Sequence, residues 1–284
     1  MSADACHAAL VSADERAVPA TGGSSVFSRA ASNYNQVGPR HFEHFARRLV
    51  DLAGVRRGAR VLDVATGTGA ILLTAAERIG DDGYLVGVDV SEEMLTRAAS
   101  AIRARGLMNA EVQVMDAQRL TFQREFDYVF CGFALTSLPD VSAALAGVAR
   151  ALRPGGRVGL VDAPSWFFLH DPRWAGQAEV FKSFGVAVGD YEPDRERDDL
   201  VGALRRTGLR DITATQESCP LVFAGEDEWW TWMWSHGSRS LLEAVPEDQL
   251  EPLKDALAAE LPPSADDGSI RGKLSAHVLL ADAP

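Results

Sequence analysis

The stretch Val61-Leu62-Asp63-Val64-Ala65-Thr66-Gly67-Thr68-Gly69 organises the rest of the chain. Its apolar first half, rich in valine, is typical of a strand that is covered on both faces. The glycines at 67 and 69 let the backbone approach a ligand where a side chain would collide. Apolar residues then recur at helical spacing from Ile71 to Ile79, and Gly80 suits the end of that helix. The pattern predicts a strand, a tight turn and a helix, with a small molecule held above the strand end.

The composition narrows the class of protein. The chain has 284 residues, 46% of them apolar, which is enough for one α/β domain with insertions. A formal net charge of -12 repels phosphate backbones and anionic lipid, so we expect neither nucleic acid nor a membrane surface as a partner. Three cysteines without CxxC spacing favour a cytoplasmic location over a disulfide framework or a metal cluster. There is no signal-peptide pattern and no apolar run near the roughly 18 residues of a membrane span.

After the glycine turn, strand and helix patterns alternate. Repeated βα units predict a mostly parallel sheet with right-handed crossovers, whose ligands bind beyond the carboxyl ends of the strands. Four predicted strands end in a carboxylate, at Asp63, Asp89, Asp116 and Asp162, which should therefore share one rim. This clustering favours a binding site. The predicted strands after the first span 83–89, 110–116, 126–130, 157–162, 211–223 and 274–281.

We expect a single domain over residues 26–284, preceded by a mobile segment. Aromatic residues crowd the stretch after the fifth strand, which predicts a lid over the rim, and a run of tryptophans falls between the last two strands. The predicted parts are a mobile segment 1–25, N-terminal cap helices 26–54, a core 55–162, an aromatic lid 163–196 and a helical insertion 225–270.

Three nucleotide-type ligands suit a glycine turn at a strand end. A P-loop requires Lys followed by Ser or Thr after its last glycine, but Ala70 and Ile71 follow here, which excludes that kind of phosphate binding. A dinucleotide fold has a third glycine at the position of Leu72, so NAD is disfavoured. The third ligand has a zwitterionic amino-acid tail over the turn, a ribose on the second acid and an adenine by the third.

Five elements in register carry a family resemblance: Asp63 to Gly69, Asp89, Asp116-Ala117, Phe126-Asp127 and Leu152 to Gly156. Together they resemble class I S-adenosylmethionine-dependent methyltransferases, a group that includes the ubiquinone and menaquinone C-methyltransferases and many methyltransferases of bacterial natural-product pathways. The resemblance covers about Val37 to Asp162. It implies a Rossmann-like, doubly wound seven-stranded α/β fold with N-terminal helices and a helical lid. The whole pattern, with the helix around Tyr34, also resembles the teleocidin-type C-methyltransferases.

The resemblance implies roles for single residues toward S-adenosylmethionine. Asp89 would accept both ribose hydroxyls, a charge-assisted pairing. Asp116 would meet the adenine amino group, and Ala117 a ring nitrogen through its N–H, while Val90 and Met94 would pack on the ring. The residues expected around the methionine portion and the sulfonium are Asp63, Ala65, Thr66, Gly67, Thr68, Gly69, Cys131 and Phe133, with Tyr34 either an ordinary packing residue or a lid.

The acceptor side departs from many relatives, because Phe133 and its neighbours stand where a histidine is common. An electron-rich carbon can attack the methyl group without a base, whereas most oxygen or nitrogen acceptors need one. The free histidines that could act as that base are His170 and His236. The Trp229 to Trp234 run is either a buried helix or an aromatic wall for an apolar acceptor. The residues expected to bind the acceptor are Phe133, Trp166, Phe167, Phe168, Trp230 and Trp234.

The sequence thus predicts a methyltransferase that acts on a hydrophobic small molecule in bacterial secondary metabolism, with C-methylation favoured. One alternative is O- or N-methylation with a histidine base. The other is a methyltransferase-like cyclase, or a module that binds S-adenosylmethionine without transferring its methyl group. Exposed tryptophans would also allow the chain to form a homo-oligomer.

Overall fold

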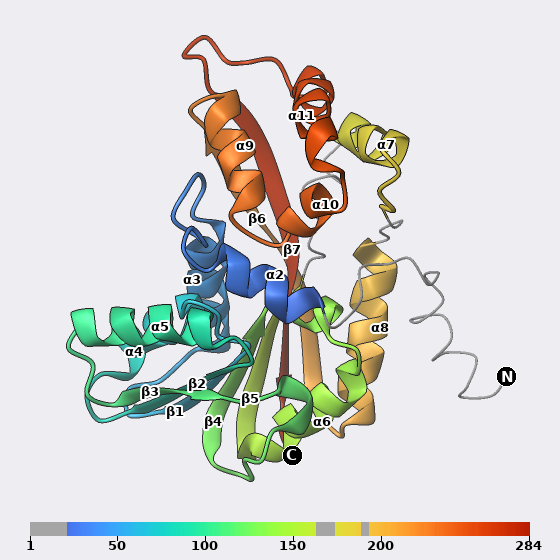
Figure 1. Cartoon of the computed structure of the whole chain (residues 1–284). Coiled ribbons are helices and arrows are strands. Elements are labelled where there is room, and N and C mark those ends of the chain that lie inside the picture. Colours follow the sequence, from blue (N-terminus) through green and yellow to red (C-terminus); the bar gives the residue numbers. More distant parts are fainter. Residues whose placement is uncertain (1–21, 163–173, 189–192) are drawn as a thin grey trace, which may run out of the picture.

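The computed structural model describes residues 22–162, 174–188 and 193–284, and within them a seven-stranded sheet has the order β3-β2-β1-β4-β5-β7-β6 (Figure 1). The first five strands run parallel, and β7 is antiparallel to both of its neighbours. This confirms the predicted doubly wound, mostly parallel sheet. The strands are β1 Arg60–Val64, β2 Tyr84–Asp89, β3 Ala110–Val114, β4 Phe126–Gly132, β5 Leu152–Asp162, β6 Arg210–Phe223 and β7 Ile270–Asp282.

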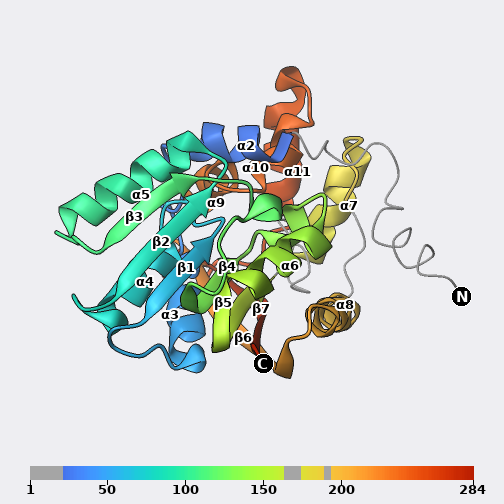
Figure 2. The ribbon, with the colours of Figure 1, turned by 90° about the horizontal axis from the view of Figure 1, so that it is seen from below.

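Helices cover both faces of the sheet. Figure 2 shows α3, α4 and α5 on one side and α6 and α8 on the other, and two separate apolar clusters fill these layers. No described helix is long and apolar enough to cross a membrane. The helices are α2 Gly22–Ala30, α3 His41–Ala53, α4 Ala70–Ile79, α5 Glu92–Ala104, α6 Val141–Ala151, α7 Ala175–Ser183, α8 Pro193–Arg206, α9 Glu226–Trp234, α10 Arg239–Glu243 and α11 Leu250–Ala259.

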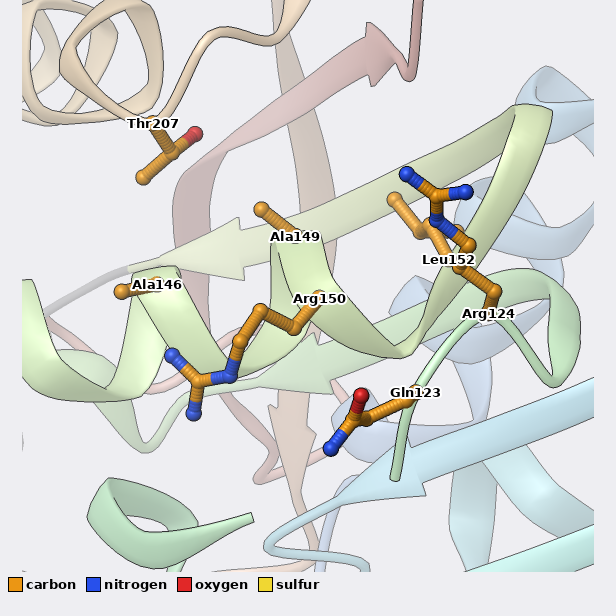
Figure 3. A pocket seen from close by; sticks show the side chains of 7 residues that line it. All are labelled: Gln123, Arg124, Ala146, Ala149, Arg150, Leu152 and Thr207. Carbon is orange, nitrogen blue, oxygen red and sulfur yellow. The ribbon is translucent and has the colours of Figure 1, made fainter. Parts of the chain in front are cut away.

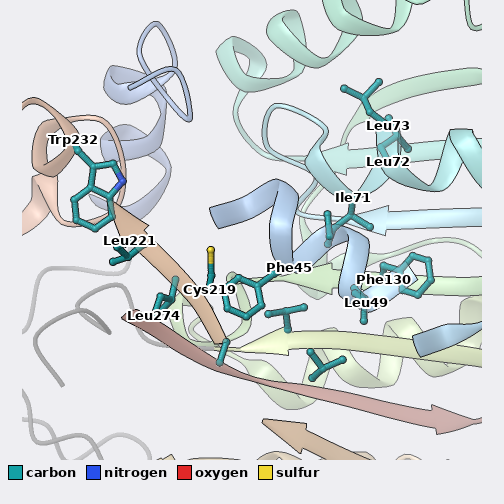
Figure 4. Packing of buried hydrophobic residues seen from close by; sticks show 14 of the residues in the cluster. Phe45, Leu49, Ile71, Leu72, Leu73, Phe130, Cys219, Leu221, Trp232 and Leu274 are labelled. Carbon is teal, nitrogen blue, oxygen red and sulfur yellow. The ribbon is translucent and has the colours of Figure 1, made fainter. Parts of the chain in front are cut away.

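Strand β1 is buried on both faces, which explains its continuous apolar sequence. Val61 belongs to the cluster under α3 and α4, whereas Leu62 and Val64 belong to the cluster under α6 and α8. Figure 4 shows Phe45 and Leu49 of α3 in the first of these layers. Because strand side chains alternate, Asp63 faces the same layer as Val61 and points at the start of α4.

The helix ends follow the sequence signals. Ser91 caps α5 by accepting a hydrogen bond from the Met94 N–H at 3.2 Å, and Gly54 ends α3 in the left-handed conformation. Helix α2 begins at Gly22, within the last residues of the segment 1–25, while residues 1–21 lie outside the described part, so the mobility of that segment stays a prediction. Packing of α2 against α5 and α10, with Val26 and Ala30 buried, overrides the weak helix propensity of its first glycines.

The last two strands reach beyond the main sheet. β5 pairs with residues 277–282 of β7, but β6 and β7 stay paired as far as Phe223 and Ile270. The free part of this ribbon carries a cap, which we define as α7, α9, α10 and α11 (Figure 1). Trp174 packs directly over the ribbon, because a Cβ on Gly272 would come within 2.7 Å of its indole ring. The cap therefore stands above the carboxyl ends of the parallel strands.

Candidate active site

The turn after β1 has an unusual backbone. Ala65 has a φ of 54° and Gly67 one of 55°, so a non-glycine residue adopts the left-handed region at the start of the turn. Such strain is concentrated at functional sites. The Thr66 N–H donates to the Val88 carbonyl at 2.9 Å, which ties the turn to β2. A Cβ on Gly67 would meet no atom within 4 Å, so the space beside the turn is open to a ligand.

Asp63 lies buried under this turn. Its Oδ2 atom accepts hydrogen bonds from the Thr66 hydroxyl at 2.6 Å and from the Leu72 N–H at 3.0 Å. Its Oδ1 atom is buried and accepts no hydrogen bond from any residue that the structure describes. Burial raises the pKa of this carboxyl to about 7. A buried, unpaired carboxylate oxygen beside an open turn is suited to a ligand ammonium group.

Asp89, at the end of β2, is held at both carboxylate oxygens. Oδ2 accepts the Gly67 N–H and Oδ1 accepts the Ser91 N–H, each at 2.9 Å. Burial raises the pKa of this carboxyl as well. Each oxygen keeps a second lone pair, so the fixed carboxylate can accept a pair of neighbouring hydroxyls.

The next carboxylate along the rim, Asp116, follows β3. Its Oδ1 accepts the Gln118 backbone N–H at 2.9 Å and the Gln118 side-chain amide at 3.1 Å. Val90, which directly follows Asp89, is exposed, whereas Met94 is buried. Asp63, Asp89 and Asp116 thus lie at the carboxyl ends of the adjacent strands β1, β2 and β3, as predicted.

A pocket opens at this edge, between the glycine turn and the N-terminal helices. Tyr34 stacks on Phe42 with a ring distance of 5.1 Å, and Phe42 meets the Phe133 ring edge-on at 5.3 Å. Burial and the Asp89 carboxylate raise the pKa of the Tyr34 hydroxyl. The wall consists of Tyr34, Phe42, Phe45, Ala46, Asp63, Ala65, Thr66, Gly67, Thr68, Ala70, Ile71, Gly132, Phe133 and Val161.

A wider groove of about 580 Å³ lies at the opposite edge of the sheet (Figure 3). Arg124 stands just before β4 and Leu152 begins β5, so the groove is at the amino ends of these strands. Among the described residues it is lined by two arginines, two alanines, Leu152, Gln123 and Thr207, with no carboxylate. Because ligands of parallel sheets bind at the carboxyl ends, the pocket at the glycine turn is the candidate site.

Comparison with known proteins gives the family. A family model described as a methyltransferase domain matches residues 61–156. Nocamycin O-methyltransferase of Saccharothrix syringae is 33% identical over 250 residues, which cover 83% of this chain and 88% of the relative. The chain belongs to the S-adenosylmethionine-dependent methyltransferases.

Further relatives agree with the predicted group. Aklanonic acid methyltransferase DauC of a Streptomyces species is 38% identical over 136 residues, covering 48% of this methyltransferase and 62% of the relative. A demethylmenaquinone methyltransferase of Listeria monocytogenes is 33% identical over 139 residues, covering 49% and 56%. The crystal structure of the YcgJ protein of Bacillus subtilis shares the fold, with a TM-score of 0.58, 22% identity and coverage of 84% and 98%.

The residues present fit the methyl donor S-adenosylmethionine, which supplies an electrophilic methyl group when bound. The unpaired Asp63 Oδ1 atom suits the amino group of a methionine moiety. The two-point fixation of Asp89 suits a ribose diol, and Asp116 keeps its Oδ2 atom clear of the two hydrogen bonds made by Gln118. The predicted roles of Asp63, Asp89 and Asp116 thus have a consistent geometry, and they stay predictions until binding is measured.

Other predicted site residues are placed differently. Cys131 is buried in the apolar layer under α6 and does not line the pocket, because its side chain points to the face opposite Asp63. Trp230 and Trp234 of α9 lie on the half-buried side of that helix, where their rings meet edge-to-face. The predicted acceptor residues Trp166, Phe167 and Phe168 and the predicted base His170 lie outside the described residues.

Two residues that the sequence did not single out join the site wall to the cap. His41 is buried, and its ring lies 4.1 Å from that of Phe42 and 6.3 Å from that of Phe133. Trp232 lies 5.9 Å from His41, edge-on, and 4.1 Å from the predicted base His236. The helical spacing of 229, 232, 233 and 236 could have identified this buried face of the cap.

The raised pKa of Asp63 predicts a pH-dependent affinity for the donor product S-adenosylhomocysteine. A carboxyl with a pKa of about 7 is mostly protonated at pH 6 and mostly ionised at pH 8. Only the ionised form pairs with an ammonium group, so affinity should rise roughly tenfold between these pH values. Calorimetric titrations at pH 6, 7 and 8 measure this slope. Asp63→Asn should bind weakly at each pH with a flat profile, and an unchanged slope in that variant would contradict the assignment.

Proposed function

We propose that this methyltransferase transfers the methyl group of S-adenosylmethionine to an acidic oxygen of an apolar small molecule in bacterial secondary metabolism. The observation that carries the proposal is the aromatic wall that runs without a break from the donor pocket into the cap. Tyr34 and Phe42 stack at its donor end, and His41 and Trp232 continue it into the cap. Of these residues, Tyr34 and Phe42 line the pocket, together with Phe133, and offer apolar contact to the body of an acceptor. His41 and Trp232 are buried and join this part of the wall to the cap.

The two buried histidines argue against a strong protein base. His236 Nδ1 lies 2.7 Å from the Trp232 carbonyl oxygen, which can only accept, so Nδ1 carries the proton and Nε2 is bare. Burial lowers the pKa of His236 to about 3 and that of His41 to about 4. Groups this weakly basic cannot remove a proton from an ordinary alcohol or phenol at neutral pH. Because these two histidines are poor bases and the predicted base His170 lies outside the described residues, we propose an acceptor oxygen that is ionised already, as in a carboxylic acid or an acidic enol.

This proposal revises the preference for carbon that the missing histidine suggested, because a carboxylate or enolate oxygen needs no base either. A relative that aligns with 83% of the chain is named an O-methyltransferase, and another is named for an acid. The positive charge of a bound sulfonium would also attract an anionic oxygen.

The test uses radiolabelled S-adenosylmethionine and a panel of apolar carboxylic acids, acidic enols, phenols and electron-rich aromatics. Each product is then treated separately with mild alkali and with dilute acid, because alkali cleaves methyl esters and acid cleaves enol ethers. We expect label in products of the acids, released as methanol by alkali because a methyl ester has formed, or label in acid-labile enol ethers. Products stable to alkali and to dilute acid would contradict an acidic oxygen acceptor. Among them, hot hydriodic acid releases the label of an aryl methyl ether as methyl iodide and leaves a carbon-bound methyl group in place. Conversion of an acceptor with the donor left intact would instead favour a cyclase.

The weak basicity of His236 gives a direct prediction for catalysis. A general base typically contributes about 10²- to 10⁴-fold to the rate, so its loss would be obvious. We expect His236→Gln to change kcat by less than about threefold between pH 6 and 8 once folding is confirmed by circular dichroism. We expect the same small change in kcat for a second variant, His41→Asn, in which an amide replaces the ring. A fall of two orders of magnitude in either variant would restore the histidine-base mechanism.

A further inference from the structure

Helix α2 links the core of the methyltransferase to its cap. It packs against α10 of the cap and against α5, the helix that follows the predicted ribose ligand Asp89. Figure 1 shows α2 lying between the carboxyl ends of the strands and the cap helices. Val26 and Ala30 of α2 are buried, so the helix is firmly packed in this position.

At the core end, Ser28 contacts the corner that holds Asp89. The Ser28 and Ser91 hydroxyls are 2.9 Å apart, and the Ser28 hydroxyl donates to Glu93 Oε2 at 2.7 Å. Ser91 in turn donates its backbone N–H to Asp89 Oδ1 at 2.9 Å. One residue therefore separates Ser28 from the predicted ribose ligand.

At the cap end, the adjacent residue Arg29 binds Glu243 of α10. The guanidinium approaches the carboxylate in a forked pair, with Nε at 3.0 Å from Oε1. Arg239 also donates to Glu243 Oε1, at 2.7 Å, and to the Arg29 carbonyl at 3.3 Å. Both arginines hold the pKa of Glu243 below its usual range. Exposed ion pairs are individually weak, but a forked geometry and a shared carboxylate make this network stronger than a single pair.

The same segment continues into the pocket wall. The Tyr34 N–H donates to the Ala30 carbonyl at 2.8 Å, so Tyr34 is tied directly to the end of α2. Tyr34 lines the candidate donor pocket together with Thr66 and Gly67. Any shift of residues 28–34 therefore moves one wall of that pocket.

We propose that residues 28–34 form a strap that couples occupation of the donor site at Asp89 to closure of the cap, with Ser28 and Arg29 as positioning residues. Neither side chain lines the donor pocket. Ser28 fastens the strap to the core and Arg29 fastens it to the cap, so breaking either contact releases the same element. A loosened strap lets the donor product escape faster.

The test measures binding and dissociation of S-adenosylhomocysteine alone, so it needs no acceptor and its outcome is independent of the proposed acceptor class. We expect Ser28→Ala and Arg29→Ala each to raise the Kd and the dissociation rate about three- to tenfold, as loss of one such contact implies. The double variant should be no worse than the weaker-binding single variant, because both changes release one element. Arg29→Lys should restore part of the affinity.

Arg157→Ala is the matched control, since it removes a forked pair of similar exposure, with Asp282 at 2.6 and 2.8 Å, away from the strap. It should leave S-adenosylhomocysteine binding unchanged. Glu243→Gln weakens the same contact from the cap side and should have the same effect as Arg29→Ala. Thermal unfolding of each variant shows whether it is still folded. Wild-type dissociation rates in folded Ser28→Ala and Arg29→Ala, or effects that simply multiply in the double variant, would overturn the strap.

Discussion

Replacing Trp232 by alanine is expected to lower the free energy of unfolding by about 3–5 kcal/mol, as for other fully buried tryptophans. Its side chain is 1% exposed and meets the Phe223 ring at 5.1 Å and the His236 ring at 4.1 Å. A Cβ on Gly38 would come within 2.9 Å of the indole, so the loop before α3 closes over it as well. The loss therefore separates the cap from the N-terminal helices as well as opening a cavity.

Urea denaturation monitored by circular dichroism measures this loss. Trp230→Ala is the matched control, because Trp230 lies on the same helix but is only half-buried. We expect it to cost less than half as much, in line with its smaller buried area. Equal losses in the two variants would contradict the placement of Trp232 as the contact between the cap and the site wall.

Replacing Asp89 by alanine is expected to weaken S-adenosylhomocysteine binding by about two orders of magnitude or more. Hydrogen bonds to a charged group contribute about 1.5–3 kcal/mol each, and a ribose diol would lose two. The Gly67 and Ser91 N–H groups would also lose the acceptor that holds the turn to the start of α5. Isothermal titration calorimetry measures the change directly.

The control for this variant is Asp127→Ala. Asp127 accepts the Arg60 N–H at 2.8 Å and pairs with Arg153 at the amino end of β4, so it resembles Asp89 in chemistry but lies away from the pocket. Its loss should leave the affinity for S-adenosylhomocysteine within about twofold of the wild type, because it makes no contact with the pocket wall. Retained wild-type affinity in Asp89→Ala would show that the ribose lies elsewhere.

Local signals were sufficient for most of the core. The continuous apolar run of β1, the acids that end β1 and β2, and the Ser91 cap each act within a few residues, so the sequence pattern predicted them correctly. The parallel register then follows from βα connectivity, which brings Asp63 and Asp89 to one rim without any further information.

Long-range packing explains what the sequence did not reveal. The helical start at Gly22 depends on contacts with α5 and α10, and the choice of Trp232 over Trp230 depends on which face of α9 meets His41. These two outcomes are set by residues far away in the chain, where no local propensity applies. Cys131 is a different case, because the local alternation of β4 directs its side chain into the layer under α6.

The stretch from Asp63 to Gly69, together with Asp89, Asp116 and the two later elements of the resemblance, predicted a methyltransferase, and the comparisons confirm the family. The donor site at the end of β1 follows from the same local features and stays a prediction. Those features are local, and connectivity brings them together. Only the tertiary structure decided what faces that site: the aromatic wall of Tyr34, Phe42 and His41, and the cap that Trp232 joins to it. These contacts exist only after the β6–β7 ribbon has carried the cap above the sheet and packed it against helices from the opposite end of the chain.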